Sequence, residues 1–253
     1  MRFALLYLAF ILSGAAGLAY EAVWSRYLGL LVGHDALAQV AVLIIFLGGM
    51  ATGATLIASR SERIARPLVW YGVVEAIIGV IALLFHDVYL GVSGLAYDAI
   101  FPALGDGIGS TLVKWLLACG IILPQSLLLG TTFPLMSAGI IRLRPHQPGR
   151  VLSWLYFTNS LGAAVGVLVA GFVLLDIAGL PGTIVIAGSV NLLVGAISVI
   201  IGVQAGTSVE IAGHEPAERG TIDRIPMLLL ITAFGTAVAS FIYEIAWIRM
   251  LSL

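Results

Sequence analysis

Glu75 is the residue of this chain whose type and position most clearly suggest chemistry, because it is a carboxylic acid within an apolar stretch. Its immediate neighbours are Val73, Val74, Ala76 and Ile77. An ionisable group at membrane depth is costly, so it is protonated, paired with a cation or bound to a ligand. Glu75 is therefore a candidate site for a cationic solute or a proton. A structural carboxyl that is hydrogen-bonded to a neighbouring helix is the alternative.

Two more glutamates, Glu21 and Glu244, lie in a motif that occurs twice. The pattern Tyr-Glu-x-x-Trp-x-Arg-x-Leu-x-Leu fills residues 20–30 and again residues 243–253. Each copy lies at the end of a long apolar run, and repeats of this scale are typical of membrane transport folds. We therefore expect one complete repeat unit, followed by the first helix of a second unit.

The tryptophan and arginine of each motif copy favour an anchoring role at the membrane interface. Tryptophan is enriched there, and arginine extends its charged end out of the lipid. We assign this structural role to Trp24, Arg26, Glu244, Trp247 and Arg249. The alternative is pairing across the repeat, with Glu21 bonded to Arg249 and Glu244 bonded to Arg26.

Asn159 and Asn191 are amides at membrane depth, where they bond neighbouring helices or contact a ligand. The candidate substrate-binding residues are Glu75, Glu21 and Asn159. The histidines lie in predicted loops, so no span offers a histidine pair that could hold a haem. The single cysteine, Cys119, excludes an internal disulfide and a cysteine cluster for metal. We expect no catalytic residue, no cofactor and no metal site.

The composition indicates an integral membrane protein. Hydrophobic residues make up 60% of the chain and charged residues 10%, whereas a soluble domain carries about 25% charged residues. The formal net charge of −1 gives no basic footprint for nucleic acid. The expected surroundings are a lipid bilayer.

Seven stretches are close to the length of about 20 apolar residues that a membrane-spanning helix needs. In lipid such stretches must be helical, because no water is present to satisfy an open strand edge. The sequence therefore predicts an all-α polytopic helix bundle. The predicted spans are Phe3–Trp24, Ala36–Ala58, Leu68–Phe85, Thr111–Ile141, Val151–Leu175, Gly182–Val203 and Met227–Trp247.

The first six spans form the predicted membrane unit, residues 1–203. A polar linker follows at residues 204–226, and residues 227–253 form the first helix of the second repeat. Two glycine pairs, Gly49 with Gly53 and Gly162 with Gly166, have the spacing that lets helix backbones approach closely.

The arginines predict the orientation of the chain. With the N-terminus inside, the inner segments hold nine of the twelve basic residues, as the positive-inside rule requires. A cleaved signal peptide at the N-terminus is the alternative. The second copy of the motif argues against it, because a segment at 233–253 cannot be a signal. The expected location is a bacterial cytoplasmic membrane.

Four segments, at residues 13–26, 48–53, 130–135 and 155–163, are similar to the membrane region of fused spermidine synthase-like proteins. The helices of that family are often likened to the major facilitator superfamily. The resemblance implies a soluble aminopropyltransferase-like domain that binds decarboxylated S-adenosylmethionine. This sequence ends just after the seventh span, so we expect it to lack that domain and not to be an enzyme.

The expected function is that of a transporter-like membrane module for a small cationic solute such as a polyamine, with Glu75 as the counter-charge. The alternative is a non-catalytic scaffold or accessory subunit of a larger membrane complex. A membrane protein partner would then cover the seventh helix. A third possibility is an enzyme subunit whose soluble domain is a separate polypeptide.

Overall fold

The computed structural model describes residues 2–33, 35–61, 63–105, 107–205 and 224–251. Within these residues all regular structure is helical, which confirms the predicted all-α class. The chain divides into two compact units, Met1–Thr207 and Ser208–Leu253. Each unit is described by itself.

The first unit contains the helices α1 to α7. Two short π-helical segments, η1 and η2, interrupt the α-helical runs. In chain order the elements are α1 Arg2–Val32, α2 Asp35–Ser61, α3 Pro67–Leu95, η1 Ala96–Ile100, α4 Phe101–Leu104, α5 Ile108–Leu143, α6 Pro148–Val169, η2 Ala170–Leu174 and α7 Leu175–Gln204. The second unit contains α8, Arg224–Leu251.

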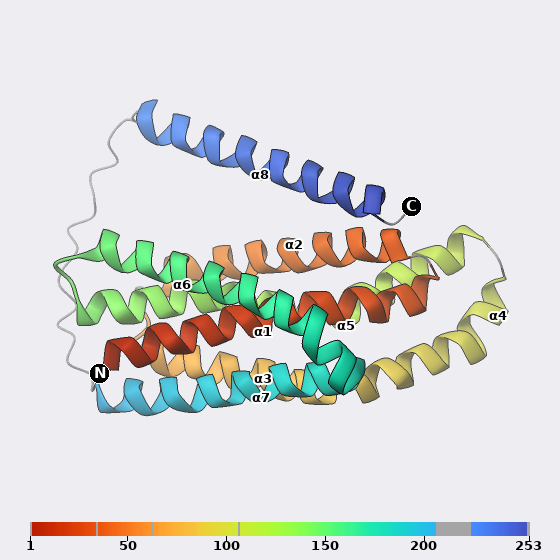
Figure 1. Ribbon diagram of the computed structural model, residues 1–253, viewed down its shortest axis with the longest axis horizontal. Coiled ribbons are helices and arrows are strands. Elements are labelled where there is room, and N and C mark those ends of the chain that lie inside the picture. The colour runs from red at the N-terminus through yellow and green to blue at the C-terminus, as the bar shows by residue number, and fades with distance from the viewer. Residues whose placement is uncertain (1, 34, 62, 106, 206–223, 252–253) are drawn as a thin grey trace. The chain divides into compact units, whose positions relative to one another are not determined.

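Six helical stretches in the described part of the chain are long and apolar enough to cross a membrane. The longest of them, Pro148–Gln204, has 57 residues. It is interrupted at Gly179, where φ is 65°, a backbone conformation that suits glycine. Gly179 lies near the start of α7, and Figure 1 shows that α7 runs back alongside the direction from which α6 came. This stretch therefore contains both the fifth and the sixth predicted spans.

Three helix pairs form the most extensive contacts of the first unit: α3 with α7, α2 with α5, and α1 with α6. The α1–α6 pair depends on Gly162 and Gly166. A Cβ atom at Gly162 would lie 2.0 Å from the carbonyl oxygen of Ile11, and one at Gly166 would lie 2.3 Å from that of Ala15. Only glycine permits this approach, as the spacing of the pair predicted.

Positive charge gathers at one end of the first unit. The turns between α2 and α3 and between α5 and α6 lie at the end where α1 begins (Figure 1). The arginines at this basic end are Arg2, Arg60, Arg63, Arg66, Arg142, Arg144 and Arg150. The opposite end carries Asp87, Asp98 and Asp176. Which end faces the cell interior stays a prediction.

Candidate functional site

Glu75 lies fully buried in α3, where it joins α3 to two other helices. Ser13 of α1 donates a hydrogen bond from Oγ to Oε1 of Glu75 over 2.5 Å. Asn191 of α7 donates a hydrogen bond from Nδ2 to Oε2. Both carboxyl oxygens therefore accept a bond from an uncharged donor on a neighbouring helix.

Two tyrosines complete this arrangement. Tyr20 of α1 donates a hydrogen bond from its hydroxyl to Oδ1 of Asn191 over 2.5 Å. Tyr71, one helical turn before Glu75, interacts through its hydroxyl with Ser13 and Glu75, although without the geometry of a well-formed hydrogen bond. We call Ser13, Tyr20, Tyr71, Glu75 and Asn191 the Glu75 network.

The sequence explains why these side chains meet. Ser13 and Tyr20 are seven residues apart, so they lie on the same face of α1. Tyr71 and Glu75 are four apart and share a face of α3 in the same way. Close packing of α3 on α7 then brings the short Asn191 side chain to Glu75. A Cβ atom at Gly72 would lie 2.6 Å from the carbonyl oxygen of Gly195.

An aromatic cluster lies next to the network on α1. The rings of Tyr20 and Trp24 stack with their centroids 5.6 Å apart. Trp24 also packs against Phe46 and Phe85 at 5.9 Å and 6.1 Å. Tyr89 donates a hydrogen bond from its hydroxyl to the carbonyl oxygen of Tyr27 over 2.8 Å.

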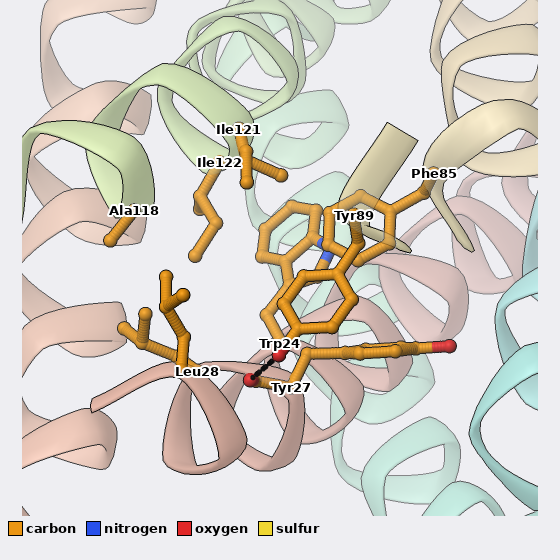
Figure 2. A pocket seen from close by; sticks show the side chains of 9 residues that line it. Trp24, Tyr27, Leu28, Phe85, Tyr89, Ala118, Ile121 and Ile122 are labelled. Carbon is orange, nitrogen blue, oxygen red and sulfur yellow. Dashed lines mark hydrogen bonds between the residues drawn. The ribbon is translucent and has the colours of Figure 1, made fainter. Parts of the chain in front are cut away.

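This cluster borders a small cavity of about 10 Å³, close to the size that holds one water molecule. Figure 2 shows Trp24, Tyr27, Phe85 and Tyr89 on one side and aliphatic side chains of α1 and α5 on the other. The lining residues are Trp24, Tyr27, Leu28, Leu31, Phe85, Tyr89, Ala118, Ile121 and Ile122.

Trp24 does not lie at the surface as the anchoring interpretation requires, since none of its side chain is exposed. The physical reason is the length of α1, which continues to Val32. Eight further residues extend the helix by about 12 Å beyond Trp24. The indole therefore lies inside the bundle, and its Nε1 atom has no hydrogen-bond partner among the described residues. Arg26, two residues later, is exposed.

Another buried amide, Gln125 of α5, lies close to α3 and was not singled out by sequence reasoning. Its Nε2 atom donates a long hydrogen bond of 3.5 Å to the carbonyl oxygen of Ile78, which follows Glu75 by three residues. Its Oε1 atom is buried and has no partner in the part of the chain that the structure describes. Gln125 therefore offers a free acceptor beside α3.

The other predicted binding residues, Asn159 and Glu21, are not members of the Glu75 network. Asn159 packs against α1 at Gly14, where a Cβ atom would lie 2.8 Å from its Oδ1 atom. Glu21 is half-buried and has interactions of its own. The hydrogen bonds to Glu75 come instead from Ser13 and Asn191. Sequence reasoning identified Glu75 and noted Asn191. It missed the roles of Ser13 and Tyr20, although Tyr20 belongs to the repeated motif.

The second motif copy lies in the other unit. Glu244 and Trp247 are exposed along α8, whereas the side chain of Arg249 lies outside the described residues. Pairing across the repeat joins two units that are described separately, so it stays a prediction. The expected membrane protein partner that covers α8 also stays a prediction. Among the described residues, no group of three or more potential metal ligands is present.

Two curated proteins of Streptomyces coelicolor are similar to this chain. Polyamine aminopropyltransferase 2 is 30% identical over 193 residues, which are 74% of this chain and 32% of that protein. Polyamine aminopropyltransferase 1 is 28% identical over 197 residues, which are 78% of this chain and 34% of that protein. The chain thus spans about a third of the length of these relatives. No protein-family model and no solved structure matches it.

These relatives correct one expectation. We expected a chain that is not an enzyme, but both relatives are named as enzymes, so the similarity points towards one. The expectation depended on where the sequence ends, which carries no such information. The resemblance to spermidine synthase-like proteins has support at this weak identity. The fused domain and the likeness to the major facilitator superfamily have none.

Proposed function

We propose that this chain is the membrane-embedded part of an enzyme of the polyamine aminopropyltransferase class, and that the Glu75 network binds the polyamine. The names of the two relatives suggest the class. The similarity to Streptomyces proteins favours a bacterial cytoplasmic membrane. This function combines an enzyme with the transporter-like handling of a cationic solute.

The observation that carries the proposal is the uncharged surroundings of a fully buried carboxyl. The hydrogen-bond partners of Glu75 are the hydroxyl of Ser13 and the amide of Asn191, and the nearby hydroxyl of Tyr71 is also uncharged. Donors of this kind hold a carboxylate without neutralising its charge. The negative charge is then available to an organic cation, for which a buried carboxylate is the usual partner in a membrane.

Other groups near Glu75 are suited to bind the remaining ammonium groups and the methylene chains of a polyamine. Such a molecule alternates ammonium groups, which donate hydrogen bonds, with short methylene chains. The free Oε1 atom of Gln125 is an acceptor for an ammonium group. The faces of Trp24, Tyr27 and Phe85 attract cations and pack against methylene groups. Because Glu75 is fully buried, entry requires the helices to separate, as in transporters that open to one side at a time.

The binding experiment compares Glu75→Gln with the purified parent protein by titration calorimetry with spermidine. Glutamine still accepts the bond from Asn191 and donates one to Ser13, so the variant is expected to fold with unchanged thermal stability. It lacks the charge, so spermidine affinity is expected to fall at least tenfold, or about 1.4 kcal/mol. The matched control is Asp176→Asn, which removes a carboxylate that is exposed.

Equal affinities for Glu75→Gln and the parent, or no binding by the parent, would refute the role of Glu75. The enzyme class is tested separately on the protein purified from its natural membrane. We expect transfer of an aminopropyl group to putrescine or spermidine from decarboxylated S-adenosylmethionine, the donor that the family resemblance implies. Absence of transfer with both acceptors would refute the class and leave the binding result unaffected.

A further inference from the structure

An open cavity of about 280 Å³ lies at the basic end of the first unit, near the lower limit of common ligand pockets. It lies between α1 and the turn that joins α5 to α6. Its lining residues are Tyr7, Arg144, Gln147, Arg150, Val151 and Trp154. Its residue Tyr7 lies six positions before Ser13 of the Glu75 network on α1, about 9 Å along the helix, and the proposed function does not use this cavity.

The polar side chains that line the cavity all carry hydrogen-bond donors. Arg144 and Arg150 both interact electrostatically with Tyr7, so the two guanidinium groups face a common space. The guanidinium carbon of Arg144 lies 3.9 Å from the ring centroid of Phe3, which holds this side chain in place by a cation–π contact. Neither arginine bonds to a carboxylate within the described residues. Two guanidinium groups without a carboxylate partner suit a phosphate, which they bind through paired hydrogen bonds.

The position of the cavity points to a membrane phosphate. Trp154 and Tyr7 carry amphipathic rings of the kind that lie at lipid headgroup level. Beyond Trp154, α6 exposes Phe157, Leu161 and Val165, a face along which acyl chains would lie. Basic pockets between membrane helices are known binding places for anionic headgroups. We propose that this cavity binds the phosphate group of an anionic phospholipid.

The test uses the full chain, stripped of lipid in a neutral detergent, and native mass spectrometry. Phosphatidylglycerol and phosphatidylcholine with the same acyl chains are titrated separately. We expect tighter binding of phosphatidylglycerol. The double substitution Arg144→Gln with Arg150→Gln is expected to reduce that affinity about 25-fold, from roughly fivefold for each arginine.

The matched control is Arg60→Gln with Arg63→Gln, which removes two positive charges from the same end but outside the cavity. It is expected to change the affinity less than threefold, and equal losses in both double variants would overturn the proposal. Millimolar inorganic phosphate separates the sources. If inorganic phosphate displaces the lipid and binds equally well alone, the cavity recognises a phosphate group, and the proposal that a phospholipid supplies it is wrong. Arg144→Lys with Arg150→Lys keeps the charge and is expected to restore part of the affinity, which a merely misfolded variant would not do.

Discussion

The hydroxyl of Tyr20 lies 2.5 Å from Oδ1 of Asn191, which ties the first copy of the repeated motif to α7. This bond fixes the orientation of the amide, because Oδ1 accepts from Tyr20 and Nδ2 is left to face Glu75. Tyr20 is therefore a positioning residue, which acts on Glu75 through Asn191. The ring of Tyr20 is itself held by its stacking on Trp24.

Removal of that hydroxyl is expected to destabilise the bundle. Tyr20→Phe keeps the ring stacked on Trp24 but leaves Oδ1 of Asn191 buried without a donor. We expect a loss of about 1–2 kcal/mol in the free energy of unfolding, the upper range for one hydrogen bond between membrane helices. Unfolding in mixed micelles measures this loss. Tyr156→Phe is the control, because Tyr156 is 70% exposed, and an equal loss there would contradict the role of Tyr20.

The contact between α1 and α6 gives a second prediction. Gly162→Ala places a methyl group 2.0 Å from the carbonyl oxygen of Ile11, so the two helices must separate. Overpacking of this kind costs about 1–3 kcal/mol. A lowered midpoint of thermal unfolding in detergent is the expected result. Gly120→Ala is the control, since a Cβ atom there meets no atom within 4 Å. No difference between the two variants would show that the helices accommodate the methyl group.

The spans of this fold could be predicted from hydropathy, because lipid forces every long apolar stretch into a helix. Glycine spacing also predicted close approach at Gly162 and Gly166, although it could not name α1 as the partner. Which helix packs against α6 depends on tertiary contacts, and the helices are apolar on all faces, so hydropathy does not distinguish one partner from another. The reversal at Gly179 lies between the predicted end of the fifth span at Leu175 and the predicted start of the sixth at Gly182, a gap that contains the charged residue Asp176 and the helix breaker Pro181.

The candidate site was less predictable. The sequence indicated Glu75 as a candidate because burying a carboxyl among valine and isoleucine residues costs free energy however the helices pack. Its partners Ser13 and Tyr20 are common residue types, and their roles depend on which face of α1 turns towards α3 and α7. Trp24 was misplaced because a tryptophan near the expected end of a span resembles an interfacial anchor. The true end of α1 at Val32 was not marked by a charged residue.

The orientation of the chain gives a third prediction. In a Cys119→Ser background, cysteines are introduced at Gly107 and Gln147, which are exposed at opposite ends of the first unit. The gathering of arginines at one end predicts that this end faces the cell interior. A membrane-impermeant maleimide added to intact cells is therefore expected to label Gly107→Cys but not Gln147→Cys. Labelling of both after lysis controls for reactivity, and the reverse pattern in intact cells would invert the proposed orientation.

The charge on Glu75 gives the last prediction, through a double-mutant cycle with Ser13. If Glu75 is a carboxylate, Ser13→Ala removes one of its donors and leaves an oxygen of a buried anion without a partner, which costs more than the loss of a neutral hydrogen bond. In the Glu75→Gln background the same change removes only a neutral bond. The free energy of unfolding is therefore expected to fall by about 0.5–3 kcal/mol more in the parent than in the glutamine background. The cycle is measured by unfolding in mixed micelles. The control is Ser189→Ala on the exposed surface of α7, made in both the parent and the Glu75→Gln background. Additive losses would show that Glu75 is neutral in the folded protein, and a neutral Glu75 provides no counter-charge for a polyamine.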